Sequence, residues 1–242
     1  MNLIIGRKPV LEALKSGEPV EQVLIVSGQK GPAIFEIQKL AKQNKVKYSE
    51  IPFQKFQSYT ADPHTQGVIA VKAEQRYFEL EELMEYSRGQ KLPFLLALDS
   101  IQDPHNLGAI LRSAECAGVD GVIMTRHNSA SVTETVVKTS AGATEHVKMC
   151  KVNNLSQALK ELKDAGYWIV GSYLDGAKNY TEVDYKMPLV LVMGNEGKGL
   201  RRLTAENCDF LAKIPMKGNI QSLNVSVAAG ILLFEISRQR EL

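Results

Sequence analysis

The sequence predicts an α/β protein, with a small N-terminal α/β module followed by a larger α/β domain that has a mostly parallel sheet. Two observations predict this class. Short runs rich in valine, isoleucine and leucine alternate with segments whose apolar residues recur at helical spacing. The runs at 94–98 and 189–192 are apolar throughout, which is typical of parallel strands that helices cover on both faces.

The composition is that of a protein with a full hydrophobic core. The 242 residues are 44% hydrophobic and 23% charged, which excludes collagen-like, disordered and disulfide-framework classes. The apolar runs are far shorter than the roughly 20 residues of a membrane span. The first nine residues place charges after a very short apolar stretch, unlike a signal peptide. Because Cys116, Cys150 and Cys208 are widely spaced, we expect reduced thiols, no zinc site and a cytoplasmic protein.

Residues 1–73 form the N-terminal module. Helical spacing at 9–16 and 34–41 alternates with strand-like runs at 23–26, 46–51 and 67–71. The module carries ten Lys or Arg and six Asp or Glu, a net charge of +4. This charge is compatible with a nucleic-acid-binding appendage, and a solvated lysine-rich face would also account for it.

Residues 74–92 are expected to form a linker or a bridging helix. The segment 74–90 holds five acidic and two basic residues, and its apolar Leu80, Leu83 and Met84 are followed by Gly89 as a stop. The boundary with the second domain is placed near 89–93.

Residues 93–242 read as repeated strand–helix units. The expected strands are 94–98, 121–124, 147–151, 167–171, 189–192 and 211–214, and the expected helices are 106–117, 155–165 and 225–238. Ligands of such sheets bind in loops beyond the carboxyl ends of the strands. Three of these loops carry unusual residues.

The first loop is 99–112, with the sequence D-S-I-Q-D-P-H-N-L-G-A-I-L-R. Asp103 and Pro104 are typical of a helix start, which places Asn106 in the first turn and Arg112 further along. An arginine there can bind a phosphate or carboxylate with two donors. Taken alone, the loop is better explained as a capped helix with a surface arginine.

The second loop follows strand 189–192 and contains Gly194, Gly197 and Gly199 within six residues. Glycines allow positive φ and close approach of the backbone to a ligand. The pattern matches neither the dinucleotide-binding glycine motif nor the phosphate-binding loop with its lysine. Glu196 in this loop is either a helix-capping carboxylate or a site residue.

The third loop runs from Ile214 to the last helix. Ser222 and Asn224 fit an N-cap region, and the small residues at 228–230 let the helix pack closely. A capped buried helix is the simpler explanation of this loop by itself. Three such loops in one order on one sheet favour a ligand site.

The three loops together resemble the SpoU/TrmH family of RNA ribose 2′-O-methyltransferases of the SPOUT superfamily. The matching segments are N-L-G-A-I-L-R-S-A, V-M-G-N-E-G-K-G-L, and I-P-M followed by S-L-N-V-S-V-A. The opening I-I-G-R-K-P-V-L-E-A-L and the later H-T-Q-G-V-I-A resemble members with an N-terminal RNA-binding module. The resemblance covers nearly the whole chain. It is strongest to bacterial members that methylate a guanosine ribose in large-subunit 23S ribosomal RNA.

This resemblance implies a deep trefoil knot in the C-terminal domain, a homodimer, and S-adenosylmethionine as the cofactor. The implied adenosine pocket is lined by Gly194, Ile214 and Leu223, with Asn195 and Met216 close by. The implied residues around the reacting ribose are Asn106, Arg112, Glu196, Ser222 and Asn224. The module 1–73 would bind the RNA substrate and 93–242 would be the methyltransferase domain.

The implied reaction is attack of a ribose 2′-hydroxyl on the methyl group of the sulfonium cofactor, which needs no metal because the cofactor carries the activated group. Arg112 stays protonated and is a poor base, so we expect it to hold a phosphate and favour the developing alkoxide. Three alternatives stay open: methylation of transfer RNA ribose, a related knotted enzyme that methylates a base, and an RNA-binding relative without catalysis.

Overall fold

The computed structural model describes residues 3–72, 76–173, 176–195, 199–220 and 222–241. The chain folds as two units, Met1–Gln75 and Arg76–Leu242. Each unit has its own sheet and its own hydrophobic core.

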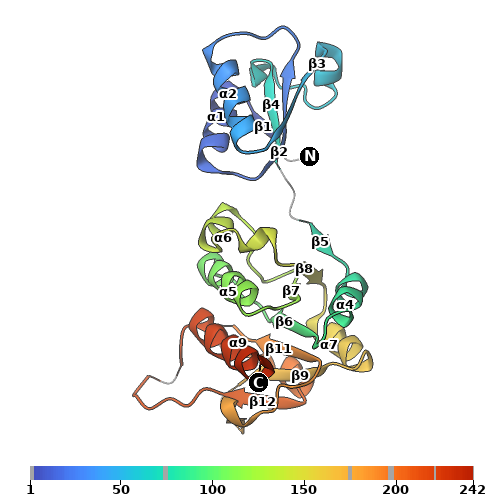
Figure 1. Cartoon of the computed structure of the whole chain (residues 1–242), viewed down its shortest axis with the longest axis vertical. Coiled ribbons are helices and arrows are strands. Elements are labelled where there is room, and N and C mark those ends of the chain that lie inside the picture. The colour runs from blue at the N-terminus through green and yellow to red at the C-terminus, as the bar shows by residue number, and fades with distance from the viewer. Residues whose placement is uncertain (1–2, 73–75, 174–175, 196–198, 221, 242) are drawn as a thin grey trace. The chain divides into compact units, whose positions relative to one another are not determined.

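The first unit is a four-stranded sheet in the order β1-β4-β2-β3 (Figure 1). β1 and β2 pair antiparallel to β4, and β3 pairs parallel to β2. Its strands are β1 (Leu3–Ile5), β2 (Val20–Val26), β3 (Lys47–Ile51) and β4 (Val68–Lys72). The helices α1 (Arg7–Ser16) and α2 (Pro32–Gln43) cover one face, and Phe56 of α3 (Phe53–Gln57) lies in a smaller cluster on the other. The expected α/β module is confirmed, with a strand at its start that the sequence pattern did not show.

The second unit is an eight-stranded sheet in the order β10-β12-β9-β11-β6-β7-β8-β5, and every neighbouring pair is parallel. Its strands are β5 (Tyr77–Phe78), β6 (Phe94–Leu98), β7 (Gly121–Thr125), β8 (Met149–Val152), β9 (Trp168–Ser172), β10 (Lys178–Asn179), β11 (Leu189–Met193) and β12 (Phe210–Lys213). β11 lies between β6 and β9, so the loops that follow β6 and β11 begin side by side.

Helices cover both faces of this sheet, as Figure 1 shows. The helices α5 (Pro104–Cys116) and α9 (Val225–Glu241) pack on one face with α6 (Glu134–Thr139) beside α5. The helices α4 (Leu80–Arg88) and α7 (Leu155–Asp164) pack on the other, with α8 (Arg202–Glu206) beside α7. The central strands are buried on both sides and carry the apolar side chains of two separate clusters. Over the described part of the chain, no helix is long and apolar enough to cross a membrane.

The segment expected to be a linker differs from that expectation. β5 pairs with β8 at the edge of the large sheet, and Leu80 and Leu83 of α4 are buried against it. The acidic residues of α4 form its solvent face, which made the segment resemble a linker. Residues 76–92 therefore belong to the second unit, and the division falls between Gln75 and Arg76.

The six expected strands and three expected helices of the second unit are all present, with ends shifted by up to three residues. α5 begins two residues early at Pro104 because Asp103 caps it: the Asp103 carboxylate accepts a hydrogen bond from the His105 backbone at 2.9 Å. The sequence pattern missed β5, β10, α6 and α8, which have two to six residues each.

Candidate active site

The candidate site lies at the carboxyl edge of the large sheet. Because the strands are parallel, the loops after β6, β7, β8, β11 and β12 all begin at this edge. The three loops singled out in the sequence are among them.

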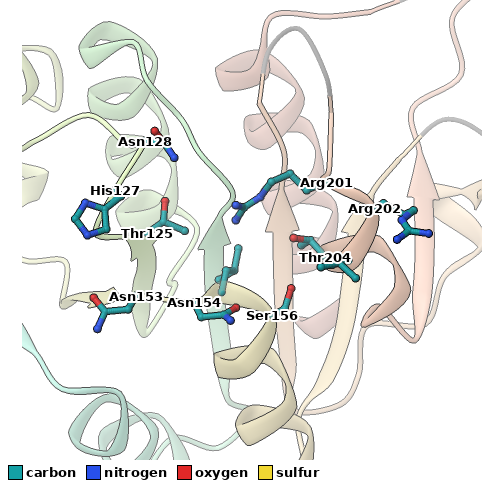
Figure 2. A pocket seen from close by; sticks show the side chains of 11 residues that line it. Thr125, His127, Asn128, Asn153, Asn154, Ser156, Arg201, Arg202 and Thr204 are labelled. Atoms are coloured by element: carbon teal, nitrogen blue, oxygen red, sulfur yellow. The ribbon is translucent and has the colours of Figure 1, made fainter.

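A cavity of about 540 Å³ lies at this edge beside the start of α8 (Figure 2). Its lining comes from the loop after β7, the loop after β8 with the first turn of α7, and the segment 201–204. These residues are Thr125, His127, Asn128, Asn153, Asn154, Leu155, Ser156, Arg201, Arg202, Leu203 and Thr204. The sequence pattern did not single out this cavity.

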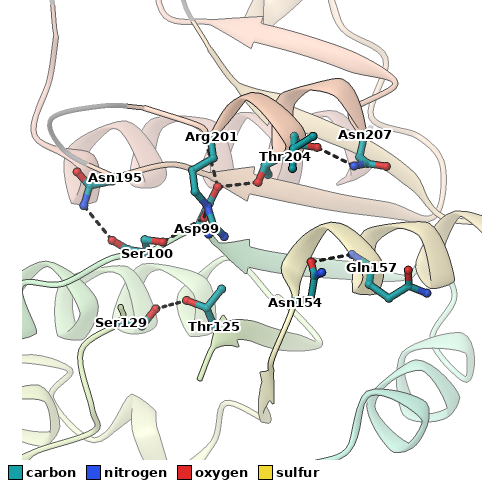
Figure 3. A network of polar contacts seen from close by, with 11 residues as sticks. Asp99, Ser100, Thr125, Ser129, Asn154, Gln157, Asn195, Arg201, Thr204 and Asn207 are labelled. Carbon is teal, nitrogen blue, oxygen red and sulfur yellow. Dashed lines mark hydrogen bonds and ion pairs between the residues drawn. The ribbon is translucent and has the colours of Figure 1, made fainter. Parts of the chain in front are cut away.

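A buried carboxylate, Asp99, organises the neighbouring segment (Figure 3). Its Oδ1 lies 2.7 Å from Arg201 Nε, and its Oδ2 accepts a hydrogen bond from Thr204 Oγ1 at 2.7 Å. The Arg201 backbone N–H and Ser100 Oγ also donate to it, at 3.3 and 3.2 Å. A buried charge needs such partners to offset its loss of hydration. Asp99 therefore ties the end of β6 to the start of α8.

The glycine-rich loop after β11 is closed at its neck by backbone hydrogen bonds. Asn195 N–H donates to Gly199 O at 3.0 Å, and Gly199 N–H donates to Asn195 O at 2.9 Å. The Asn195 side chain donates to Ser100 O at 2.9 Å, which joins the second loop to the first (Figure 3). Glu196, the acidic residue expected in this loop, lies outside the described residues.

The first and third loops meet through two asparagines. Asn224 Nδ2 donates to Asn106 Oδ1 at 2.9 Å, across 118 positions of sequence. The side-chain oxygen of Asn224, Oδ1, accepts hydrogen bonds from the Ser226 and Val227 backbone N–H groups at 2.8 and 3.4 Å. Asn224 therefore caps α9, as the N-cap region expected from the sequence implies. Asn106 is buried, whereas Asn224 is exposed. The side-chain oxygen of Asn224 thus caps α9, while its side-chain nitrogen binds Asn106.

The structure does not connect Arg112 to the other predicted residues. Arg112 lies on the exposed side of α5 and forms no hydrogen bond or ion pair with the described residues of its own chain. Ser222 is also exposed and has no such bond within the same residues. Because α5 is held in place by the packing of its buried face, the guanidinium of Arg112 is available to a ligand.

The predicted cofactor residues differ in their exposure. Gly194 is buried, Ile214 packs against the core, and Met216 is half-buried. Leu223 keeps 36% of its surface exposed and Ile220 keeps 78%. The third loop therefore presents apolar side chains that the described residues do not cover.

Sequence reasoning missed Asp99, Arg201 and Thr204 as a group. A carboxylate directly after an apolar strand looks like an ordinary turn residue, and the pattern carries no sign that it is buried. No cluster of three or more His, Cys, Asp or Glu side chains is placed to hold a metal among the residues described.

Comparison with known proteins identifies the family. Residues 93–234 match the SpoU rRNA Methylase family, and residues 3–78 match the family described as RNA 2′-O ribose methyltransferase substrate binding. A TrmH family tRNA/rRNA methyltransferase of Staphylococcus saprophyticus is 43% identical over 239 residues, which cover 98% of this chain and 96% of the relative.

Solved structures of similar fold agree with this match. The AdoMet-bound rRNA methyltransferase from Sinorhizobium meliloti is 29% identical, with a TM-score of 0.67 over 98% of this chain and 86% of the other. AviRb from Streptomyces viridochromogenes, in complex with the cofactor AdoMet, is 25% identical, with a TM-score of 0.67 over 99% and 90%. The α/β fold with a parallel sheet, the three loops and the sequence match agree: this chain belongs to the SpoU rRNA methylase family.

Proposed function

We propose that this protein transfers a methyl group from S-adenosylmethionine to a ribose 2′-hydroxyl of RNA, with a guanosine of 23S ribosomal RNA as the target. Family membership and the two AdoMet-bound structures of similar fold support the cofactor and the reaction class. The observation that carries the proposal is the 2.9 Å hydrogen bond between Asn224 and Asn106. It joins two of the three motif loops at the ligand-binding edge of the sheet, where a cofactor and a substrate can meet.

The residues of the second and third loops fit a nucleoside-type cofactor. A Cβ on Gly194 would lie 2.2 Å from the Gly199 carbonyl carbon, so the neck of the loop excludes any side chain and brings two backbone segments together. Backbone amides of this kind can bind the edge of an adenine ring, and the uncovered Leu223 and half-buried Met216 can contact its faces. Gly194, Asn195, Ile214, Met216 and Leu223 are the residues proposed to hold the cofactor.

The cofactor supplies a methyl group that is already activated on a sulfonium. Arg112 cannot act as a base, because a guanidinium stays protonated. In this proposal its donors hold a substrate phosphate and favour the negative charge that develops on the ribose oxygen. Asn106, Glu196, Ser222 and Asn224 would hold the loops and the ribose, with the proton leaving to phosphate or water.

The first unit is proposed to bind the RNA. Its match to a substrate-binding family and its ten Lys or Arg against seven Asp or Glu support contacts with a phosphate backbone. An RNA substrate and three cysteines outside disulfides are consistent with a cytoplasmic enzyme. The trefoil knot that the resemblance implies stays a prediction.

We also propose a homodimer formed through the second unit. Val227 and Phe234 lie seven residues apart on α9, hence on one face, and are 50% and 52% exposed. An exposed apolar stripe of this kind is typical of an interface. In such a dimer Arg112 of one protomer would approach the cofactor of the other, which fits its lack of a hydrogen-bond or ion-pair partner among the described residues of its own chain.

A methyl-transfer assay tests the proposal. Purified protein is incubated with methyl-labelled S-adenosylmethionine and unmethylated 23S ribosomal RNA. Nuclease digestion and mass spectrometry are then expected to show one ribose-methylated guanosine. A methyl group on a base, or RNA binding without any transfer, would overturn the proposed reaction.

A parallel reaction with transfer RNA tests the second candidate substrate. This candidate is favoured by the name of the Staphylococcus relative, which covers both RNA classes. Transfer to transfer RNA alone would replace the ribosomal target and leave the reaction class unchanged.

A further inference from the structure

We propose that the cavity beside α8 binds a phosphate-bearing nucleotide of the RNA substrate, one that flanks the nucleotide to be methylated. This inference rests on the proposed function and adds a binding site outside the three motif loops. The cavity of about 540 Å³ lies within the range of about 300–1,000 Å³ that is typical of small-ligand sites. It also opens at the carboxyl edge of a parallel sheet, where ligands of such folds bind.

The charged groups of the cavity favour an anion. Its lining contains Arg201, Arg202 and His127 but no carboxylate. Asp99 touches Arg201 from outside this lining, and its carboxylate already accepts four hydrogen bonds or ion-pair contacts. Arg202 is 85% exposed and also has a carboxylate partner outside the lining, Glu206 at 3.8 Å. The lining therefore offers two guanidinium groups as donors to a phosphate, with no carboxylate beside them in the lining.

Arg201 is held in place for such a role. Its Nε is anchored to Asp99 at 2.7 Å, yet 53% of the side chain stays exposed. Its two terminal nitrogens have no other partner among the described residues. Figure 2 shows the guanidinium extending between Thr125 and Thr204. An arginine anchored through one nitrogen loses little further freedom when its remaining donors bind a phosphate.

The other lining groups suit the base and sugar of a nucleotide. Asn153 is exposed and makes no hydrogen bond with the described residues, so its amide can both donate to and accept from a base edge. Asn154 uses its carbonyl oxygen to cap α7 through Gln157 N–H at 3.2 Å, which leaves its amide nitrogen as a donor. Leu203 is 58% exposed and provides an apolar surface in the same lining. A simple inorganic anion would use neither the amides nor this apolar surface.

The cavity is connected to the glycine-rich loop through the chain. Arg201 follows Gly199 by two positions, and Gly199 closes the neck of that loop. Asp99 binds Arg201 while its neighbour Ser100 accepts from Asn195. A nucleotide in the cavity would therefore contact the segment that continues into the proposed cofactor loop, which is the position expected of a flanking nucleotide.

Binding of a fluorescein-labelled, single-stranded RNA dodecamer to the full chain tests this inference by anisotropy at several salt concentrations. Asn153→Asp adds a negative charge without changing side-chain size and is expected to weaken RNA binding about fivefold. Arg201→Gln is expected to reduce the slope of log affinity against log salt by about 0.7, the loss of one phosphate contact on a single strand. The matched control is Gln90→Glu, which adds the same charge before β6, at the opposite edge of the sheet, and should leave affinity and slope unchanged.

RNA affinity within twofold of wild type for Asn153→Asp, together with an unchanged salt slope for Arg201→Gln, would overturn the inference. Guanosine 5′-monophosphate is titrated in parallel: if both variants lose its binding but keep RNA affinity, the cavity is a free-nucleotide site and the inference is also wrong. Cofactor affinity should be unchanged in Asn153→Asp. If the wild-type protein binds RNA but transfers no methyl group, the proposed function is wrong. The comparison of the variants would then still show whether the cavity contributes to RNA binding. Wild type that binds no RNA would overturn both.

Discussion

Gly194 lies against the backbone of Gly199, so closely that a Cβ on Gly194 would be 2.2 Å from the Gly199 carbonyl carbon and 2.4 Å from Leu200 N. The φ angle of Gly194 is not in the left-handed region, so space rather than backbone conformation requires the glycine. The two hydrogen bonds between Asn195 and Gly199 hold the segments at this distance. The glycine is thus a condition for closing the loop.

Gly194→Ala is expected to open this neck. The backbone atoms around the new methyl group cannot move without breaking the Asn195–Gly199 pair, so we expect a loss of about 1–3 kcal/mol in unfolding free energy. Cofactor affinity, measured by calorimetric titration, should fall at least tenfold. Gly230→Ala is the control, because its Cβ would lie 3.9 Å from Ser113 Oγ, an ordinary contact. Wild-type melting temperature and cofactor affinity in Gly194→Ala would contradict this account.

The strands were predictable where burial on both faces leaves only apolar residues. β6 and the first four residues of β11 occur where the runs F-L-L-A-L and L-V-L-V indicate them. The position of α4, in contrast, was not predictable from its composition. Its composition reflects its acidic solvent face, whereas its place in the fold depends on Leu83 packing over Gly121, where a Cβ would lie 2.3 Å from Leu83 Cδ1. Such a contact between distant residues leaves no periodic signal.

The site was predictable only in part for the same reason. Local patterns placed Asn106 at a helix start and Asn224 in an N-cap region, and family resemblance implied that both lie around the reacting ribose. No local pattern relates residues 118 positions apart. Asp99 was missed because its burial depends on β11, Arg201 and Thr204, which all lie about a hundred positions away. The cavity lining comes from three separate segments and has no sequence motif.

The three cysteines are expected to differ sharply in reactivity. Burial raises the pKa of Cys150 and of Cys208 to about 12, while Cys116 is exposed on α5. Only the thiolate reacts, so both thiols with raised pKa stay protonated and slow between pH 7 and 9. Titration with a chromogenic disulfide at pH 8 should show one fast thiol in the folded protein and three after unfolding. Cys116→Ser should remove the fast phase, and two or more fast thiols in wild type would contradict the prediction.

Phe234→Asp is expected to disrupt the proposed dimer. The substitution places a charge in the exposed apolar stripe of α9, and a desolvated unpaired charge at an interface costs several kcal/mol. Sedimentation velocity at micromolar concentration should shift from dimer to monomer without a large change in melting temperature. Phe35→Asp on the first unit is the matched control, because Phe35 is 68% exposed and should not affect assembly. A fully active wild-type monomer would remove the dimer from the mechanism.

Removal of residues 1–75 is expected to separate RNA binding from cofactor binding. The second unit has its own sheet and two hydrophobic clusters, so it should fold without the first. Loss of a net charge of +3 should weaken RNA binding at least tenfold and reduce its salt dependence. Cofactor affinity should stay within twofold of the full chain. If the shortened protein binds RNA as tightly as the full chain, the first unit has another role.

Arg112→Ala tests the proposed role of the free guanidinium. Arg112 makes no hydrogen bond or ion pair with the described residues, so its removal should cost less than about 1 kcal/mol of stability. If it holds the substrate phosphate and the developing alkoxide, the single-turnover rate should fall about a hundred- to a thousandfold. Arg112→Lys should not restore the rate, because an ammonium cannot reproduce a planar contact with two donors.

The control for Arg112 is Lys160→Ala, which removes an exposed cation from α7 of the same unit. If Arg112 acts only through the general positive field, both variants should lose a similar, small part of the rate, and that part should disappear at high salt. A specific contact predicts instead that only the Arg112 variants are slow, at every salt concentration, with unchanged cofactor affinity.

In a dimer, mixing Arg112→Ala with Gly194→Ala protomers sharpens the test. If Arg112 of one protomer serves the cofactor of the other, a mixed dimer contains one site with both groups intact. Partial recovery of the rate on mixing would support that arrangement, whereas no recovery would place Arg112 beside the cofactor of its own protomer.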